Sequence, residues 1–392
     1  MTNTLQSLRE QLDQIDQKVV ECLAQRQSVV QQVAQYKKSS NTAPIQDVQR
    51  EENLLSRIQE LSQQAGLDGH FVEKLYKEIL QYSLRSQQES LVDQQNPGRK
   101  KQRVMVSYQG TDGAYSHLAG MNHFAPRDVE PTFRGFDTFQ EMLEAVQHGA
   151  ADYAMLPIEN TTAGSINQAY DLLARMDLKL VGEEIQPVDH CLVTLKPVPI
   201  THIRRIFSHP QALAQCSYYL NQLKHAKVEA FTDTAMAVKR VRDEKDLSQA
   251  AIASAEAAKI YGLHIVKQGI ANQRQNYTRF VIASASSIEV DARIPCKTSL
   301  VMSTKHEDGA LAKCLGVLAS HQLNLTKLES RPKPNNPWEY LFYLDFEGNI
   351  AQEDTQKALK ELKQFTKDIK VLGSYPARTI KPKASQQNQS LD

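Results

Sequence analysis

The sequence lacks the features of secreted, membrane-bound and nucleic-acid-binding proteins. The N-terminus has no basic start followed by an apolar run, so we expect no signal peptide. No uninterrupted apolar stretch is long enough to cross a membrane. The formal net charge is only +1, which argues against a nucleic-acid partner or an acidic solvating tail. We therefore expect a cytoplasmic protein without membrane or nucleic-acid partners.

Patterns for disulfides, metal sites and dinucleotide binding are also missing. The five cysteines are scattered, odd in number and free of CxxC pairs, so they are expected to be reduced thiols. The turn "GTDGAYSH" (110–117) follows a strand-like run, but its spacing is not the GxGxxG of dinucleotide-binding folds. Its glycines could still let backbone N–H groups approach an anion at a helix start, or simply form an ordinary turn. We predict no metal and no redox cofactor.

The first ninety residues predict three helices, over residues 4–38, 47–64 and 70–94. The first helix carries an apolar heptad seam at Leu5, Leu8, Leu12, Ile15, Val19, Cys22, Val29, Val33 and Tyr36. A 35-residue helix is about 50 Å long, which is too long for two shorter helices to cover. We therefore predict a homodimer through this helix and leave a higher oligomer open.

Charged residues on this predicted helix form an unusual set. Arg26 occupies a seam position that should be apolar, while Arg9 and Lys37 lie on one flank, about 42 Å apart. In an antiparallel helix pair, Arg9 of one chain could approach the other two cations of its partner and form a site for a small polyanion. Other polar pairs at i,i+4 spacing are Asp47 with Glu51 and Ser83 with Gln87. The alternative is a set of solvated faces with one register-setting charge.

From Arg103 to about residue 285, short strand-like runs alternate with helical ones, which predicts an α/β domain. Polar clusters follow the strands at "PIENTTAGSI" (157–166), "FSHPQALAQC" (207–216) and "NYTRF" (276–280). Such clusters at strand ends suit a ligand cleft, although helix caps would use the same residue types. Residues 298–376 then follow the order βαββαβ, which predicts a ferredoxin-like α+β domain. Residues 377–392 are polar, and we expect a disordered tail.

The helical segment (1–92) resembles the AroQ-type chorismate mutase domain, an intertwined helical dimer, through "LRE…D…AQR…K…D..RE…S…Q". The resemblance implies catalysis by Arg26, Lys37 and Gln87, with Lys37 and Gln87 at the breaking ether bond. The chorismate-binding set that it implies is Arg9 (from the partner subunit), Arg26, Lys37, Asp47, Glu51, Ser83 and Gln87. An extra residue between Lys37 and Pro44 makes Lys38 a rival for the lysine role.

Residues 103–285 resemble prephenate dehydratase, whose two lobes, similar to periplasmic binding proteins, enclose a cleft. "PIEN" (157–160) and "TRF" (278–280) are the most specific matches. The resemblance implies that Thr278 protonates or orients the departing hydroxyl of prephenate. Because threonine is a poor acid, we expect it to need a water relay or a neighbouring group, for which Glu159 is the candidate. The prephenate-binding set that it implies is Glu159, Asn160, Thr161, Ser208, Gln215, Thr278 and Arg279. The glycine-rich turn departs from the family pattern, since Thr111 replaces proline and Ala114 replaces a hydroxyl residue.

The C-terminal segment resembles an ACT regulatory domain through "GALA" (309–312) and "ESRP" (329–332). The resemblance implies phenylalanine as a feedback effector, bound by Gly309, Ala310, Leu311, Asn324, Glu329, Ser330 and Arg331. A solvated strand beside a close-packed helix start is the simpler alternative.

Taken together, about 370 of the 392 residues resemble the bifunctional P-protein family of phenylalanine biosynthesis. The resemblance implies conversion of chorismate through prephenate to phenylpyruvate. One rival function keeps the mutase but makes the second domain an NAD-dependent prephenate dehydrogenase, against which the missing GxGxxG argues. The other is a non-enzymatic sensor of amino acids.

Overall fold

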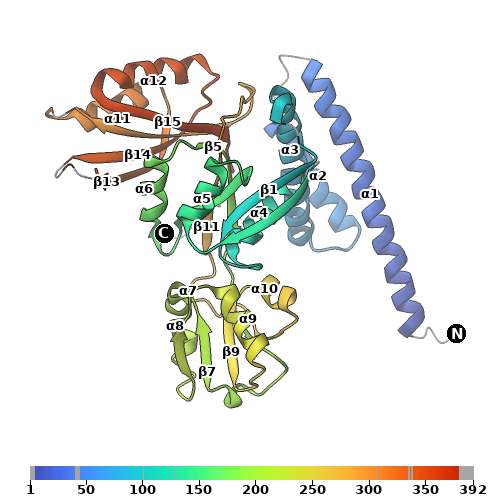
Figure 1. The fold of residues 1–392 in the computed structure, drawn as a ribbon. Coiled ribbons are helices and arrows are strands. Elements are labelled where there is room, and N and C mark those ends of the chain that lie inside the picture. The colour runs from blue at the N-terminus through green and yellow to red at the C-terminus, as the bar shows by residue number, and fades with distance from the viewer. Residues whose placement is uncertain are drawn as a thin grey trace, which may run out of the picture. The chain divides into compact units, whose positions relative to one another are not determined.

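The computed structural model describes residues 5–39, 45–99, 101–127, 129–305, 307–333, 336 and 339–378 (Figure 1). The chain divides into two compact units. The first is Met1–Lys100 with Glu289–Ile294, and the second is Lys101–Ile288 with Pro295–Asp392. The predicted domain limits of 1–92, 103–285 and 298–376 differ from the boundaries of these two units and stay predictions. In the described part of the chain, no helix combines the length and apolar character needed to span a membrane.

The first unit contains the three helices predicted from the sequence, and their limits agree within two residues. They are α1 (Leu5–Ser39), α2 (Val48–Gln64) and α3 (Gly69–Gln95), followed by a 3₁₀ turn at Pro97–Arg99. Asp47 and Asp68 begin α2 and α3 as N-caps, because their carboxylates accept the backbone N–H groups of Arg50 and Phe71. Gly66 adopts φ +71° just after α2, where a left-handed residue ends the helix.

Helix α1 leaves its apolar seam in solvent. Leu12 is 59% exposed and Val19 is 52% exposed, and the other seam residues of α1 are exposed as well. Its contacts to α3 include hydrogen bonds from Arg26 and Gln27 to serines of α3. Helices α2 and α3 of the same unit therefore leave the apolar seam of α1 uncovered.

Two α/β lobes make up residues 101–284 of the second unit. Lobe 1 has the sheet order β2-β1-β3-β11-β5, with β1, β2 and β3 parallel and β11 antiparallel to both of its neighbours. Its strands are β1 (Arg103–Gln109), β2 (Glu130–Phe136), β3 (Tyr153–Asn160), β4 (Gly164–Ser165), β5 (Lys179–Pro187) and β11 (Tyr277–Ser284). Its helices are α4 (Tyr115–Phe124), α5 (Phe139–Gln147) and α6 (Asn167–Arg175).

Lobe 2 repeats the same sheet pattern in the order β10-β6-β9-β7-β8. Its strands are β6 (Cys191–Thr194), β7 (Arg205–Ser208), β8 (Lys227–Ala230), β9 (Gln249–Ala253) and β10 (His264–Lys267). Its helices are α7 (Pro210–Gln215), α8 (Ser217–Leu220), α9 (Thr234–Glu244) and α10 (Ala255–Tyr261), with a 3₁₀ turn at Ile200–His202. The chain enters lobe 2 after β5 and returns to lobe 1 at β11, so two segments join the lobes.

The C-terminal domain confirms the predicted order βαββαβ. Its elements are β12 (Cys296–Thr304), α11 (Ala310–Ser320), β13 (Asn324–Pro332), β14 (Tyr340–Glu347), α12 (Glu353–Phe365) and β15 (Thr366–Pro376). The antiparallel sheet has the order β13-β14-β12-β15, and α11 and α12 cover one face (Figure 1). Of the predicted disordered tail, Ala377 and Arg378 still bond to Pro295 and Glu183, and residues 379–392 lie outside the described ranges.

The other face of this sheet packs on lobe 1. Tyr343 and Tyr375 belong to the same buried cluster as Leu156 and Leu180 of lobe 1. At Gly373 the two backbones come so close that a Cβ atom would lie 1.9 Å from the Leu180 carbonyl oxygen. Only glycine allows this approach, so the C-terminal domain and lobe 1 share one core.

Candidate active sites

A cleft between the two lobes is lined by neutral polar side chains. Its lining residues are Thr162, Gln211, Ala214, Gln215, Ala271, Asn272, Gln273 and Asn276. They come from the end of β3, from α7 and from the segment that returns the chain to β11. The cleft therefore lies beside the segment that returns the chain from lobe 2 to lobe 1.

Asn160, the last residue of β3, organises the polar groups beside this cleft. Its Oδ1 accepts the backbone N–H groups of Thr162 and Ala163 at 3.0 and 2.9 Å, which identifies this atom as the oxygen. Its Nδ2 therefore donates to Thr278 Oγ1 at 3.0 Å and to Asn276 Oδ1 at 2.8 Å. Since the Thr278 oxygen accepts this bond, and no described residue accepts the Thr278 hydroxyl hydrogen, that hydrogen is available to a ligand.

Gln215 of lobe 2 extends this series of hydrogen bonds. Its Nε2 donates to Thr162 Oγ1 at 2.5 Å and to Asn160 Oδ1 at 3.3 Å, so its Oε1 faces His190 Nε2 at 2.8 Å. An amide oxygen only accepts, so His190 carries hydrogen on Nε2, and Nδ1 faces the Tyr115 hydroxyl at 3.2 Å. Burial lowers the pKa of His190, which favours its neutral form.

The glycine-rich turn between β1 and α4 receives a carboxylate from lobe 2. The N–H of Thr111 donates to Asp233 Oδ2 at 3.2 Å, and a Cβ on Gly110 would lie 2.3 Å from that oxygen. The N–H of Gly113 donates to His117 Nδ1 at 3.0 Å. The anion that the turn approaches is thus a side chain of the protein, and Asp233 ties the two lobes together.

In the helical unit, Ser83 on α3 connects two of the residues predicted for chorismate. Arg26 on α1 donates a hydrogen bond to the Ser83 hydroxyl. Gln87 donates to the Ser83 carbonyl at 3.4 Å, and its buried Oε1 has no hydrogen-bond partner among the described residues. Because a buried amide group without a partner costs about 1–3 kcal/mol, this position suits a bound polar ligand.

Lys37, near the end of α1, lies beside the start of α2. Its Nζ donates to the Ile45 carbonyl at 2.7 Å. Burial lowers the pKa of Lys37, while the nearby carboxylates of Asp47 and Glu51 raise it and Arg50 lowers it further. The structure thus brings Lys37 and both acidic residues of the predicted set together.

Known proteins match the chain over both regions. Its sequence fits the family profiles chorismate mutase type II over residues 8–88 and prephenate dehydratase over residues 106–287. The bifunctional chorismate mutase/prephenate dehydratase of Enterobacter agglomerans is 38% identical over 380 residues, covering 97% of this chain and 98% of that protein.

The chain belongs to the bifunctional chorismate mutase/prephenate dehydratase family.

Two solved structures are similar to the part of this family member that follows the helical unit. GqqA, described as a novel type of quorum quenching acylase, has a TM-score of 0.63 and 34% identity, covering 70% of this chain and 98% of its own. A prephenate dehydratase from Arthrobacter aurescens in complex with L-Phe also has a TM-score of 0.63, with 27% identity, covering 70% of this chain and 90% of its own.

Within this bifunctional chain, one predicted mutase residue does not join the others. Arg9 on α1 is exposed, and none of the described residues bonds its side chain. The side chain of the rival Lys38 lies outside the described part of the structure, whereas Lys37 lies beside Asp47 and Glu51. The described contacts therefore favour Lys37 for the lysine role.

Two of the residues predicted for prephenate hold backbone in place. Thr161 is exposed, and its hydroxyl accepts the N–H of Tyr277 at 2.9 Å, which joins the ends of β3 and β11. Ser208 is 0% exposed, and its hydroxyl donates to the Ile252 carbonyl at 2.6 Å. The prediction that Ser208 lines the cleft is corrected, since the side chain is enclosed in the core of lobe 2.

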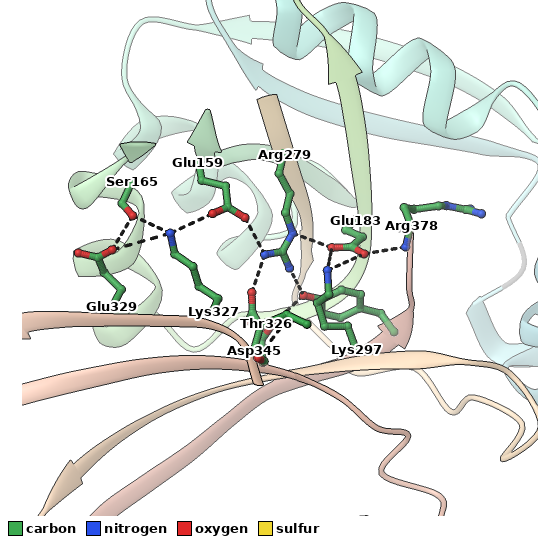
Figure 2. Close-up of polar contacts among 12 residues, drawn as sticks. Glu159, Ser165, Glu183, Arg279, Lys297, Thr326, Lys327, Glu329, Asp345 and Arg378 are labelled. Carbon is green, nitrogen blue, oxygen red and sulfur yellow. Dashed lines mark hydrogen bonds and ion pairs between the residues drawn. The ribbon is translucent and has the colours of Figure 1, made fainter. Parts of the chain in front are cut away.

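Glu159 and Arg279 lie on the side of lobe 1 that faces the C-terminal domain (Figure 2). Arg279 is 8% exposed, and its guanidinium bonds to Glu159, Glu183 and Asp345 at 3.1, 2.6 and 2.6 Å. Glu159 also bonds to Lys327 at 2.9 Å. The structure thus places neither residue with Thr278, because their charged groups are paired in this interface.

The predicted effector residues are likewise divided between two places. Gly309 begins α11 with φ +69°, Ala310 is buried there, and Leu311 is half-buried. On β13, Arg331 bonds to Asp171 of lobe 1 at 2.8 and 3.1 Å, and Glu329 accepts the Ser165 hydroxyl at 2.5 Å.

The charged groups of Glu329 and Arg331 therefore bind lobe 1 and do not face the start of α11. Asn324 bonds to Glu347 at 3.1 Å, and Ser330 is exposed.

The sequence interpretation omitted Thr162, His190 and Asn276 from the predicted site. Thr162 and Asn276 stood inside the quoted polar clusters, which was the available signal. His190 stands alone between β5 and β6, so no local pattern marked it.

Proposed function

We propose that this chain rearranges chorismate to prephenate in its helical unit and converts prephenate to phenylpyruvate in the cleft between the lobes. The two activities are those in the name of its family. The proposal assigns them to separate sites, and for the dehydratase it rests chiefly on the available hydroxyl hydrogen of Thr278.

In the mutase site, Arg26 and Lys37 bind the carboxylates of chorismate, together with Arg9 of the partner subunit. Lys37 and Gln87 hydrogen-bond the ether oxygen, which gains negative charge as its bond to the ring breaks. Asp47 and Glu51 hold the ring hydroxyl, and Ser83 keeps Arg26 in position. The rearrangement needs no nucleophile, so the site acts by holding a compact conformer and stabilising charge.

A homodimer supplies Arg9 to this site. The exposed apolar seam of α1 supports an intertwined antiparallel pair, because such a row of side chains is normally covered by another helix. Arg26 and Lys37 then lie on one chain, and Arg9 reaches them from the other.

In the dehydratase site, Thr278 donates a hydrogen bond to the departing hydroxyl of prephenate. The electrons of the breaking bond to the carboxylate enter the ring, carbon dioxide leaves, and the hydroxyl departs with the electrons of its C–O bond. A threonine is too weak an acid to transfer its proton fully, so its role is to stabilise charge on the departing oxygen, which solvent then protonates. Asn160 and Gln215 orient Thr278 and the substrate.

The C-terminal domain is an ACT domain that binds phenylalanine near the start of α11 and inhibits the dehydratase. Its ferredoxin-like order and the L-Phe complex of the similar dehydratase support this assignment. Two lobes joined by two segments likewise support a periplasmic-binding-protein-like closure of the cleft. The cytoplasmic location stays a prediction.

A direct test gives the purified full-length chain chorismate in the absence of nicotinamide cofactors. We expect chorismate to be consumed and phenylpyruvate to accumulate, with phenylalanine slowing only the second step. A dehydrogenase would stop at prephenate until NAD is added. A sensor would leave chorismate unchanged, and either result would contradict the proposal.

A further inference from the structure

A buried network of charges crosses the boundary between lobe 1 and the C-terminal domain (Figure 2). Lobe 1 contributes Glu159, Glu183 and Arg279, and the C-terminal domain contributes Lys297, Lys327 and Asp345. Lys327 also lies 3.8 Å from Glu329 of its own strand, and opposite charges pair across the boundary at Arg279–Asp345, Lys297–Glu183 and Lys327–Glu159. Each domain therefore neutralises charges that the other one buries.

Arg279 is the centre of this network. It bonds to two carboxylates of lobe 1 and to Asp345 of β14, and it also donates to the Tyr375 hydroxyl at 3.1 Å. Burial alone would raise the pKa of Glu183, but the charges of Arg279 and Lys297 lower it below the usual range. The network thus holds ionised groups in a place where an unpaired charge would be costly.

The residues of this network alternate with the residues of the dehydratase site. In the pairing of β3 with β11, Asn160 lies opposite Thr278, and the next pair is Glu159 opposite Arg279. Successive side chains of a strand point to opposite faces of a sheet. One pair therefore serves the site while its neighbour in the same two strands binds the C-terminal domain.

The path from the C-terminal domain to the reactive hydroxyl is short. Lys327 of β13 bonds to Glu159 at 2.9 Å, Glu159 precedes Asn160 in the chain, and Asn160 bonds to Thr278 at 3.0 Å. Lys327 also bonds to the Ser165 hydroxyl at 2.7 Å, so it binds lobe 1 at two points.

We propose that the Glu159–Arg279 pair is the link through which the C-terminal domain positions Asn160 and Thr278, with Lys327 and Asp345 as the groups that hold it. A shift of β13 or β14 relative to lobe 1 moves Glu159 and Arg279, and the adjacent site residues move with them. An effector that favours the shifted arrangement lowers dehydratase activity through this link. The inference rests on the proposed dehydratase activity and its inhibition by phenylalanine.

The test compares two lysines of the same interface in the full-length protein. Lys327→Met removes the bonds to Glu159 and Ser165 and the ion pair with Glu329. Lys370→Met is the matched control, because among the described residues Lys370 of β15 bonds only to the carbonyls of Leu173 and Met176, at 3.3 and 2.6 Å. The measurements are dehydratase kcat and KM with prephenate, the phenylalanine concentration for half-inhibition, thermal unfolding, and mutase activity as an internal reference.

We expect Lys327→Met to lower dehydratase kcat at least fivefold with little change in KM, and to raise the half-inhibiting phenylalanine concentration about tenfold. Lys370→Met stays within twofold of the wild type in both, and Lys327→Arg restores kcat. The inference is overturned if the two methionine variants behave alike, if arginine fails to restore kcat, or if Lys327→Met changes only stability. A wild-type chain without dehydratase activity or phenylalanine inhibition would instead refute the proposed function itself.

Discussion

The two sites of this chain handle related dicarboxylates with opposite kinds of side chain. The helical unit offers two cations: Arg26 bonds to Ser83 of α3, and Lys37 lies near the carboxylates of Asp47 and Glu51. The cleft between the lobes is lined by neutral amides and hydroxyls, and the nearby Arg279 turns its charge to the C-terminal domain. Positive charge suits a site that binds and compresses a dianion, whereas neutral directed hydrogen bonds suit a site from which a carboxylate must leave as uncharged carbon dioxide.

The sites also differ in how much of each lies in one chain. Asn160 comes together in the second unit with Gln215, 55 residues away in the chain, and with Thr278, 118 residues away. Arg9 stays exposed on a helix whose apolar seam is uncovered. This contrast predicts that the dehydratase site is complete in one chain and that the mutase site depends on association.

The largest effect is expected at the dehydratase site. Thr278→Ala removes a hydroxyl whose hydrogen no described residue accepts, and loss of a donor of this kind lowers kcat about 10²–10³-fold. Mutase activity should be unchanged, and Thr278→Ser should retain most dehydratase activity. Parallel assays with chorismate and prephenate measure the two activities, and equal loss of both would contradict separate sites.

Arg26→Ala tests the other side of the comparison. Loss of a guanidinium that pairs with a substrate carboxylate should cost about 2–3 kcal/mol, or roughly 10²-fold in mutase kcat/KM. Gln27→Ala is the control, since Gln27 is the next residue on α1 and bonds to Ser86 instead. Mutase assays should separate the two variants, and dehydratase assays should not.

A smaller effect is expected from pH. Burial lowers the folded-state pKa of His190, so its neutral form contributes stability that is complete above the ordinary value of about 6.5 and lost as pH falls through the folded pKa. A proton on Nδ1 would also place a positive charge beside Gln215, in a site otherwise lined by neutral groups.

Dehydratase activity, corrected for uncatalysed prephenate decay, should therefore fall up to about tenfold per pH unit once the pH drops below the folded-state pKa of His190. His190→Gln should flatten that limb of the profile. If the fall of activity at acid pH is unchanged in the variant, His190 is not the group responsible for it.

The smallest effect concerns the support behind the dehydratase site. Gly373→Ala forces a Cβ against the Leu180 carbonyl and should destabilise the second unit by about 1–3 kcal/mol. Gly316→Ala in α11 meets no atom within 4 Å and should stabilise the domain by about 0.5–1 kcal/mol. Chemical unfolding measures both, and similar shifts would mean that the close approach of β15 to β5 is not needed.

Sequence patterns predicted elements and their order better than they predicted which way side chains face. The three helices of the first unit and the βαββαβ order follow from local patterns, and each appears where it was expected. Asn160 and Thr278 were assigned together with their neighbours Glu159 and Arg279, yet adjacent strand residues face opposite sides. Nothing in the sequence tells which side of β3 and β11 the C-terminal sheet covers.

His190 and Ser208 show the same limit in another way. Ser208 ends a strand, as a cleft residue would, but the packing of β7 against β9 encloses it. His190 lies 25 residues before Gln215, and only the folding of lobe 2 brings their side chains together. Both outcomes depend on tertiary contacts that no local spacing encodes.

The separation of the two sites is the central claim, and mixing two inactivated proteins tests it most directly. Thr278→Ala chains and Arg26→Ala chains are purified separately, and each is given chorismate alone and then together with the other. Each alone should form almost no phenylpyruvate, the first because prephenate accumulates and the second because none is made. The mixture should form phenylpyruvate after a lag, as prephenate passes from one protein to the other. No phenylpyruvate from the mixture, with prephenate present and both proteins folded, would contradict two independent sites.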